Sequence, residues 1–159
     1  MNRNERFTKG NHMDLTIKLF AELSTSELYE ILKSRAQIFV VEQNCVYQDL
    51  DDIDKISTHF FYQNGSGLIE AYLRVFPISD MPGCVQIGRV LTLHHGSGLG
   101  GELLHQTISY LKKNNLAHTI FLDAQVYAKG FYEKENFQIC SDEFLEDGIP
   151  HVRMRLTLV

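Results

Sequence analysis

The sequence predicts a single α+β domain, an α/β sandwich in which a β-sheet is flanked by helices. Two observations lead to this class. Short apolar or alternating segments with the length of strands are interleaved with longer segments whose apolar residues have helical spacing. The chain has 159 residues, of which 44% are hydrophobic, so it is long enough to bury one core and has an ordinary globular composition. We expect residues 13–159 to form this domain and residues 1–12 to form a flexible tail.

The N-terminal half is expected to contain a strand, a helix and then three strands. Apolar and polar residues alternate over 13–20, which is typical of a strand. Ser24 and Glu27 have the spacing of a capping box and predict the start of a helix whose apolar stripe runs to Phe39. Asn64-Gly65 predicts a hairpin turn between two apolar runs. The strands that follow the helix are expected over 59–63, 68–76 and 84–92.

Charged residues interrupt the apolar segments of this half. An acidic loop covers residues 49–54, and three arginines lie inside apolar segments, where an unpaired charge is unfavourable. We therefore expect ion pairs between two groups of residues, which are Arg35, Arg74 and Arg89, and Asp49, Asp51 and Asp54.

A glycine-rich turn separates the strand at 84–92 from the next amphipathic segment. Its glycines are Gly96, Gly98, Gly100 and Gly101. The segment after the turn carries an apolar face made of Leu103, Leu104, Ile108 and Leu111. The first turn of a helix has unpaired N–H groups and the positive end of the helix dipole, and glycines let a ligand approach the backbone. The succession of strand, glycine turn and helix therefore predicts a phosphate-binding site.

Two interpretations of this phosphate site remain. Gly96 to Gly101 fit the pattern G-x-G-x-x-G, and Asp123 stands where a dinucleotide-binding fold places the acid that binds ribose. The chain after Asp123 is too short for the further βα units of that fold, so a dinucleotide-binding oxidoreductase is the weaker alternative. The remaining pattern predicts a strand, a short helix and an antiparallel pair of strands, over 119–124, 128–135, and 137–141 with 152–158.

Composition argues against several classes of function. The net charge of −5 provides no basic stripe for nucleic acid and suits a cationic amine as substrate. The longest apolar runs are far shorter than the roughly 20 residues of a membrane span, and the N-terminal segment lacks the apolar core of a signal peptide. The cysteines and histidines have no metal-ligand spacing. We expect no metal, a cytoplasmic location and free thiols at Cys45, Cys84 and Cys140.

The glycine turn resembles motif A of the GNAT superfamily of acyl-CoA-dependent N-acetyltransferases, written (Arg/Gln)-x-x-Gly-x-(Gly/Ala). Here the motif reads His95-Gly96-Ser97-Gly98-Leu99-Gly100, with His95 in the place of Arg or Gln. Further segments over residues 15–155 are similar to the ElaA-like branch of that superfamily, among them Val40-Val41-Glu42-Gln43-Asn44-Cys45 and Glu146-Asp147-Gly148-Ile149-Pro150-His151. The resemblance implies the GNAT fold, a mixed and mostly antiparallel sheet that splays at the acyl-CoA cleft.

The resemblance also implies a function. We expect an acetyl-CoA-dependent N-acetyltransferase that transfers an acetyl group to a primary amine by direct attack of the amine on the thioester. Small-molecule and peptide amines are both open as acceptors, and so is a homodimer. The alternative from another class is an acyl-CoA-binding regulatory module without turnover. The reasons for this alternative are a shortened link after Arg89, His95 in motif A, and Asn136 in the place of a family glycine.

The same resemblance assigns residues to the cofactor. The pyrophosphate would be held by His95, Gly96, Ser97, Gly98, Leu99 and Gly100. The acyl and pantetheine parts would lie along the backbone of Val90, Leu91 and Thr92, with one N–H group facing the developing oxyanion. Gln125 would line the same pocket.

The catalytic groups are assigned in part. Tyr132 aligns with the superfamily tyrosine that can protonate the thiolate of coenzyme A. The general base is open between Glu42 and His151, because imidazoles ordinarily titrate near neutral pH and a carboxylate needs burial to approach it.

Overall fold

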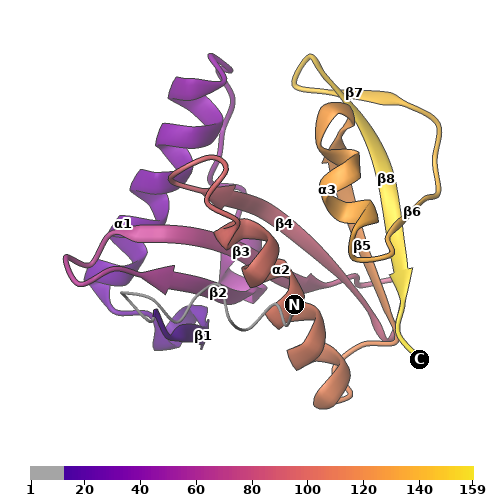
Figure 1. Ribbon diagram of the computed structural model, residues 1–159, viewed down its shortest axis with the longest axis horizontal. Helices are drawn as coiled ribbons and strands as arrows, with labels where there is room; N and C mark the ends of the chain where they lie inside the picture. The colour runs from indigo at the N-terminus through magenta and orange to yellow at the C-terminus, as the bar shows by residue number, and fades with distance from the viewer. Residues whose placement is uncertain (1–12) are drawn as a thin grey trace.

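The computed structural model describes residues 13–159, which form one mixed β-sheet with helices on both faces (Figure 1). The expected tail, residues 1–12, lies outside the described residues. The strand order is β1-β2-β3-β4-β5-β8-β6, and β7 pairs with β8. The strands are β1 (Leu15–Leu19), β2 (Thr58–Gln63), β3 (Ile69–Pro77), β4 (Cys84–Thr92), β5 (Thr119–Gln125), β6 (Gln138–Ile139), β7 (Phe144–Glu146) and β8 (Ile149–Thr157). The helices are α1 (Thr25–Arg35), α2 (Leu99–Lys113) and α3 (Lys129–Glu133).

Helix α1 covers one face of the N-terminal half of the sheet. Its expected capping box is confirmed, since the amide of Glu27 donates to Ser24 Oγ (3.0 Å) and the amide of Ser24 donates to Glu27 Oε1 (2.8 Å). The helix continues as a π-helical segment, η3 (Ala36–Glu42). A small apolar cluster joins this arm to the sheet, and it consists of Ile31, Ile38, Phe61, Ile69, Tyr72 and Leu91.

Helix α2 lies on the opposite face, where the larger core forms. Leu103, Leu104 and Leu111 are at most 3% exposed and pack against the inward side chains of the central strands, among them Phe60, Leu73, Ile87, Ile120 and Leu122. The short helix α3 contributes Tyr132 to the same core. The expected hairpin between β2 and β3 and the later strands β4 and β5 are confirmed by the observed pairing.

The C-terminal segment differs from the expectation in one element. The final antiparallel pair exists, but β6 is only two residues long, and a further strand, β7, forms a hairpin with β8. The turn of this hairpin is Asp147-Gly148, with φ values of +49° and +78°. Asp-Gly is a strong hairpin signal because both central residues of a type I′ turn need positive φ. This signal was present in the sequence, and it identifies the strand that the prediction missed.

Strands β4 and β5 form the one parallel pair within residues 13–159, and they separate halfway along. Their pairing ends at Ile87 and Leu122. Immediately beyond that point β4 contains a bulge, where Arg89 and Val90 stand opposite the single residue Leu73 of β3. A bulge bends its strand and increases the local twist, so β4 turns away from β5 and the sheet splays as expected.

The doubly wound parallel sheet of a dinucleotide-binding oxidoreductase is absent from the described chain, so that alternative is wrong.

The ion pairs expected in the N-terminal half are confirmed. Arg35 contacts Asp49 (2.9 Å) and Asp54 (2.6 Å). Arg74 contacts Asp54 (2.9 Å) and Asp51 (2.7 Å). Arg35 and Arg74 are at most 2% exposed. Burial alone would raise the pKa of Asp54, but the hydrogen bonds and charges of the two arginines outweigh it and hold that pKa below its ordinary value.

We predict that Asp54→Asn lowers the free energy of unfolding by about 3 kcal/mol, because it removes one charged partner from each of two buried arginines. Asp52→Asn is the matched control, since Asp52 lies in the same loop with its side chain 85% exposed, and we expect it to change stability by less than about 0.5 kcal/mol. Chemical denaturation of both variants and the parent at neutral pH measures the difference.

The same comparison has a predictable pH dependence. Since the pKa of Asp54 is lowered in the folded protein, the unfolded chain binds the proton more tightly, and the stabilisation is lost as the pH falls below the unfolded value of about 4. The stability gap between Asp54→Asn and the parent should therefore narrow as the pH is lowered from 7 to 3. A gap that stays constant would show that the charge of Asp54 does not contribute.

Candidate active site

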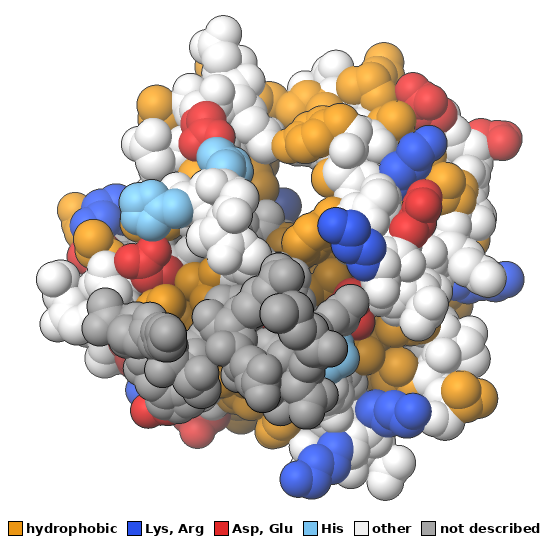
Figure 2. Space-filling model, in the orientation of Figure 1, with side chains coloured by type: hydrophobic (Ala, Val, Ile, Leu, Met, Phe, Trp, Pro, Cys, Tyr) orange, Lys and Arg blue, Asp and Glu red, His pale blue; other side chains and the backbone are white. Residues whose placement is uncertain are grey.

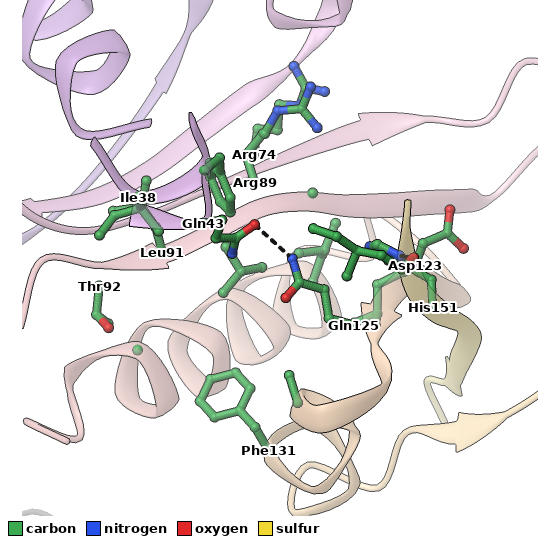
Figure 3. Close-up of a pocket in the computed structure, with 18 of the residues that line it drawn as sticks. Ile38, Gln43, Arg74, Arg89, Leu91, Thr92, Asp123, Gln125, Phe131 and His151 are labelled. Atoms are coloured by element: carbon green, nitrogen blue, oxygen red, sulfur yellow. Dashed lines mark hydrogen bonds between the residues drawn. The ribbon is translucent and has the colours of Figure 1, made fainter. Parts of the chain in front are cut away.

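A cleft of about 1090 Å³ opens where β4 and β5 separate. The space-filling view is hollowed between the two halves of the molecule (Figure 2), and the close-up shows residues of β4, β5 and η3 around the same space (Figure 3). The glycine turn lines one part of the cleft, and the ends of β5 and β8 line another. All the predicted site residues line it except Leu99, whose side chain packs against the core.

The glycine turn presents an open cradle at the start of α2. Gly96 and Gly98 have φ values of +78° and +79°, and a Cβ built on either would meet no atom of the described residues within 4 Å. Gly98 is the N-cap residue of α2. Gly100 has a different role, because a Cβ there would stand 2.7 Å from Thr92 Cγ2, so glycine lets the helix start pack against β4. The free N–H groups of a helix start beside open space fit a pyrophosphate.

His95 and Glu42 form a pair at the edge of the cleft. His95 Nε2 lies 2.5 Å from Glu42 Oε1, and the two side chains are 68% and 44% exposed. The sequence assigned them separate roles, one on phosphate and one as base, and the structure brings them together. The pair ties the loop before α2 to the end of η3. Glu42 therefore faces an imidazole rather than an apolar pocket.

Two contacts cross the cleft from the segment that follows η3. Gln125 Nε2 donates to Gln43 Oε1 (3.1 Å), which joins the end of β5 to the residue that follows η3 (Figure 3). The Cys45 thiol lies 3.6 Å from the carbonyl oxygen of Asp147 in the β7–β8 turn. Gln43 was not among the predicted site residues. The signal that could have found it is its place in the segment Val40–Cys45, on which the resemblance rests.

His151 lies opposite Gln125 near the start of β8, and it is 7% exposed. Its Nδ1 atom is 2.7 Å from the carbonyl oxygen of Ile149. Since a carbonyl oxygen only accepts hydrogen bonds, Nδ1 carries a hydrogen and donates it to this carbonyl. Nε2 lies 3.4 Å from Glu146 Oε2, and Phe144 stacks on the ring (5.9 Å). The imidazole is thus oriented on both sides and has Nε2 beside a carboxylate.

Tyr132 lies on α3, where it lines the cleft and is 8% exposed. Its ring packs edge-on against Phe131 (5.0 Å) and Phe137 (6.1 Å). Burial raises the pKa of its hydroxyl well above the ordinary value, so the group stays protonated at neutral pH and acts as a donor. Asn136, in the turn after α3, has a φ of +69°, so asparagine maintains the left-handed backbone in the place of glycine.

Asp123, which the sequence offered as a ribose-binding acid, has a structural partner. It faces Arg153 Nη1 at 3.2 Å. No group of three His, Cys, Asp or Glu side chains that could hold a metal ion occurs in residues 13–159. Over the same residues no helix is long and apolar enough to cross a membrane.

A sheet splayed beside a glycine-lined helix start defines the class of acyl-CoA-dependent acyltransferases. Comparison with known proteins agrees. Residues 41–158 match the model of the acetyltransferase (GNAT) domain. The chain is 38% identical over 151 residues to a UPF0039 protein of Schizosaccharomyces pombe, covering 93% of this chain and 99% of that one. It is 35% identical over 138 residues to the protein ElaA of Escherichia coli, covering 84% and 90%.

Solved structures give the same result. An acyl-CoA N-acyltransferase from Pseudomonas aeruginosa superposes with a TM-score of 0.83 at 34% identity, covering 91% of this chain and 99% of that one. Escherichia coli ElaA also superposes with a TM-score of 0.83, at 31% identity and the same coverage. This chain belongs to the GNAT acetyltransferase family. It is an acyltransferase of the ElaA-like branch, and acetyl-CoA is the acyl donor that the family uses.

The glycine cradle provides the first test of the cleft. We predict that Gly98→Ala weakens coenzyme A binding at least about tenfold, or about 1.4 kcal/mol, because the methyl group projects into the open space over the helix start. Gly67→Ala is the matched control, since Gly67 has a φ of +84° and equally open surroundings in the β2–β3 turn. Both variants carry similar backbone strain. Equal affinities of the two folded variants in calorimetry would remove the cradle from the cofactor site.

Proposed function

We propose that this protein transfers the acetyl group of acetyl-CoA to a primary amine, which attacks the thioester directly without an acetylated enzyme. The reaction joins the amine nitrogen to the carbonyl carbon and breaks the carbon–sulfur bond, which releases coenzyme A. One observation carries the proposal: a single cleft contains both a glycine cradle for pyrophosphate and an oriented, buried imidazole.

The backbone of β4 supports the acyl group in this proposal. Beyond Ile87 the edge of β4 that faces β5 has no strand partner among residues 13–159, so its N–H and C=O groups over Val90, Leu91 and Thr92 are available for pantetheine and the thioester. An N–H group aimed at the carbonyl oxygen stabilises the negative charge that develops there. The helix start holds the pyrophosphate, and Gln125 lines the cleft next to the acyl position.

His151 is the proposed general base. In this proposal Nε2 takes the proton from the amine, and Glu146, 3.4 Å from Nε2, stabilises the imidazolium that forms. Glu42 is less suited to act as the general base, because its side chain is partly exposed and contacts His95. The structure thus favours one of the two candidates that the sequence left open. His95, through its contact with Glu42, orders the loop that precedes the cradle.

The experiment is turnover with a panel of amines that includes diamines, amino sugars and peptides with free N-termini. We expect thiol release that depends on one class of amine, and a stoichiometric amount of acetylated amine. His151→Gln should lower kcat by about 100-fold, and Glu42→Gln by less than about fivefold. Binding of acetyl-CoA without thiol release for any amine would instead indicate a regulatory module.

Mass spectrometry of the protein after incubation with acetyl-CoA alone tests direct attack. We expect the mass to be unchanged. A gain of one acetyl group would place a covalent enzyme intermediate on the pathway.

Tyr132 is proposed to donate a hydrogen bond to the departing thiolate. Tyr132→Phe keeps the ring packing and removes the hydroxyl, so kcat should fall by about 100-fold while acetyl-CoA affinity persists. Tyr62→Phe is the matched control, because Tyr62 is a 5% exposed tyrosine of the same core that does not line the cleft. If kcat falls less than about threefold in Tyr132→Phe, the tyrosine is structural and water supplies the proton.

A further inference from the structure

The bulge of β4 has an unusual backbone that a side chain holds in place. Arg89 has a φ of +53°, in the left-handed region that a residue with a Cβ rarely adopts. Its guanidinium reaches out of the strand to the acidic loop. Nε donates to Asp49 Oδ1 (2.8 Å), and Nη2 donates to the carbonyl oxygen of Asp49 (3.0 Å) and to Asp51 Oδ2 (3.3 Å).

Asp49 is itself held by two further residues, Arg35 and Tyr47. Arg35 Nε donates to Asp49 Oδ2 (2.9 Å), Arg35 Nη2 donates to the Asp49 carbonyl (3.0 Å), and the Tyr47 hydroxyl donates to Oδ1 (2.9 Å). Asp49 is 7% exposed, and Arg35, on the last turn of α1, is fully buried. A continuous path of charged hydrogen bonds therefore runs from α1 through Arg35, Asp49 and Arg89 to the bulge.

We infer that Asp49 is a positioning residue for acyl transfer. It touches no reacting atom, but through Arg89 it fixes the backbone at Arg89–Val90, and so sets the direction of the β4 N–H groups that receive the thioester oxygen. This role rests on the proposed function, since it needs the edge of β4 to hold the acyl group. The pyrophosphate cradle is on a different segment. Loss of Asp49 should therefore affect turnover much more than cofactor affinity.

The test compares Asp49→Asn with Asp52→Asn. Asparagine keeps the shape of Asp49 but loses the charge that holds Arg89, so we expect kcat to fall about tenfold or more while the affinity for coenzyme A changes less than about twofold. Asp52 belongs to the same loop, is 85% exposed and does not line the cleft, so Asp52→Asn should leave both quantities unchanged. An unchanged kcat in folded Asp49→Asn would overturn the inference, since a purely structural role moves stability alone.

Arg89→Gly supplies the second variant and the double-mutant cycle. Glycine adopts a φ of +53° without strain, so this variant permits the bulge but disconnects it from Asp49. We expect its kcat to fall as in Asp49→Asn, and Asp49→Asn in the Arg89→Gly background to lower kcat less than about twofold further. The same tenfold loss in both backgrounds would show that Asp49 does not act through Arg89.

Amide NMR spectra separate failure of this inference from failure of the proposed function. In Asp49→Asn the amide signals of Val90 and Leu91 should shift and exchange faster with solvent, and in Asp52→Asn they should not. If the parent protein turns over no amine, the proposed function fails and these spectra still report whether Asp49 fixes the bulge. Unmoved Val90 and Leu91 signals in Asp49→Asn would overturn the inference whatever the turnover.

Discussion

The bulge in β4 is the constraint on which the cleft depends. A residue with a side chain loses about 1–2 kcal/mol in the left-handed region, and the charged hydrogen bonds of Arg89 with Asp49 and Asp51 offset this cost. Without the bulge, β4 would continue beside β5, and the N–H and C=O groups along its edge would be hydrogen-bonded to β5. The buried network of Arg35, Asp49 and Arg89 thus holds the backbone of the bulge in one arrangement. Buried ion pairs contribute little net stability, but they specify one arrangement of the groups they join.

In the proposed reaction, one end of the cleft binds the cofactor and the other end carries out the chemistry. The glycine cradle at the start of α2 offers open space and N–H groups. The end of the cleft where we propose the reaction is buried instead of open, since His151 and Tyr132 are both at most 8% exposed. His151 is oriented by a hydrogen bond to Ile149, and Tyr132 by aromatic packing. Contacts to distant parts of a substrate can therefore hold it, while the buried groups act on the atoms whose charge changes.

Most of the fold could be predicted from the sequence, because its signals are local. The capping box at Ser24, the hairpin at Asn64-Gly65 and the glycine turn each specify structure within a few residues. The contact of Glu42 with His95 and that of Gln43 with Gln125 were not predicted. They join residues 53 and 82 positions apart, and no sequence period indicates such a pairing. His59 shows the same limit, since its partners, the Tyr72 hydroxyl (2.7 Å) and the Asp54 carbonyl (3.0 Å), are set by the folded sheet and the acidic loop.

The central claim is that the glycine turn and the bulged edge of β4 together form the acetyl-CoA site. A crystal structure with acetonyl-CoA, a thioether analogue that keeps the carbonyl oxygen, tests it most directly. The account predicts pyrophosphate oxygens on the N–H groups at the start of α2, and the carbonyl oxygen about 3 Å from an N–H group of Val90 or Leu91. An analogue bound outside the cleft, or bound with its carbonyl away from β4, would contradict the account.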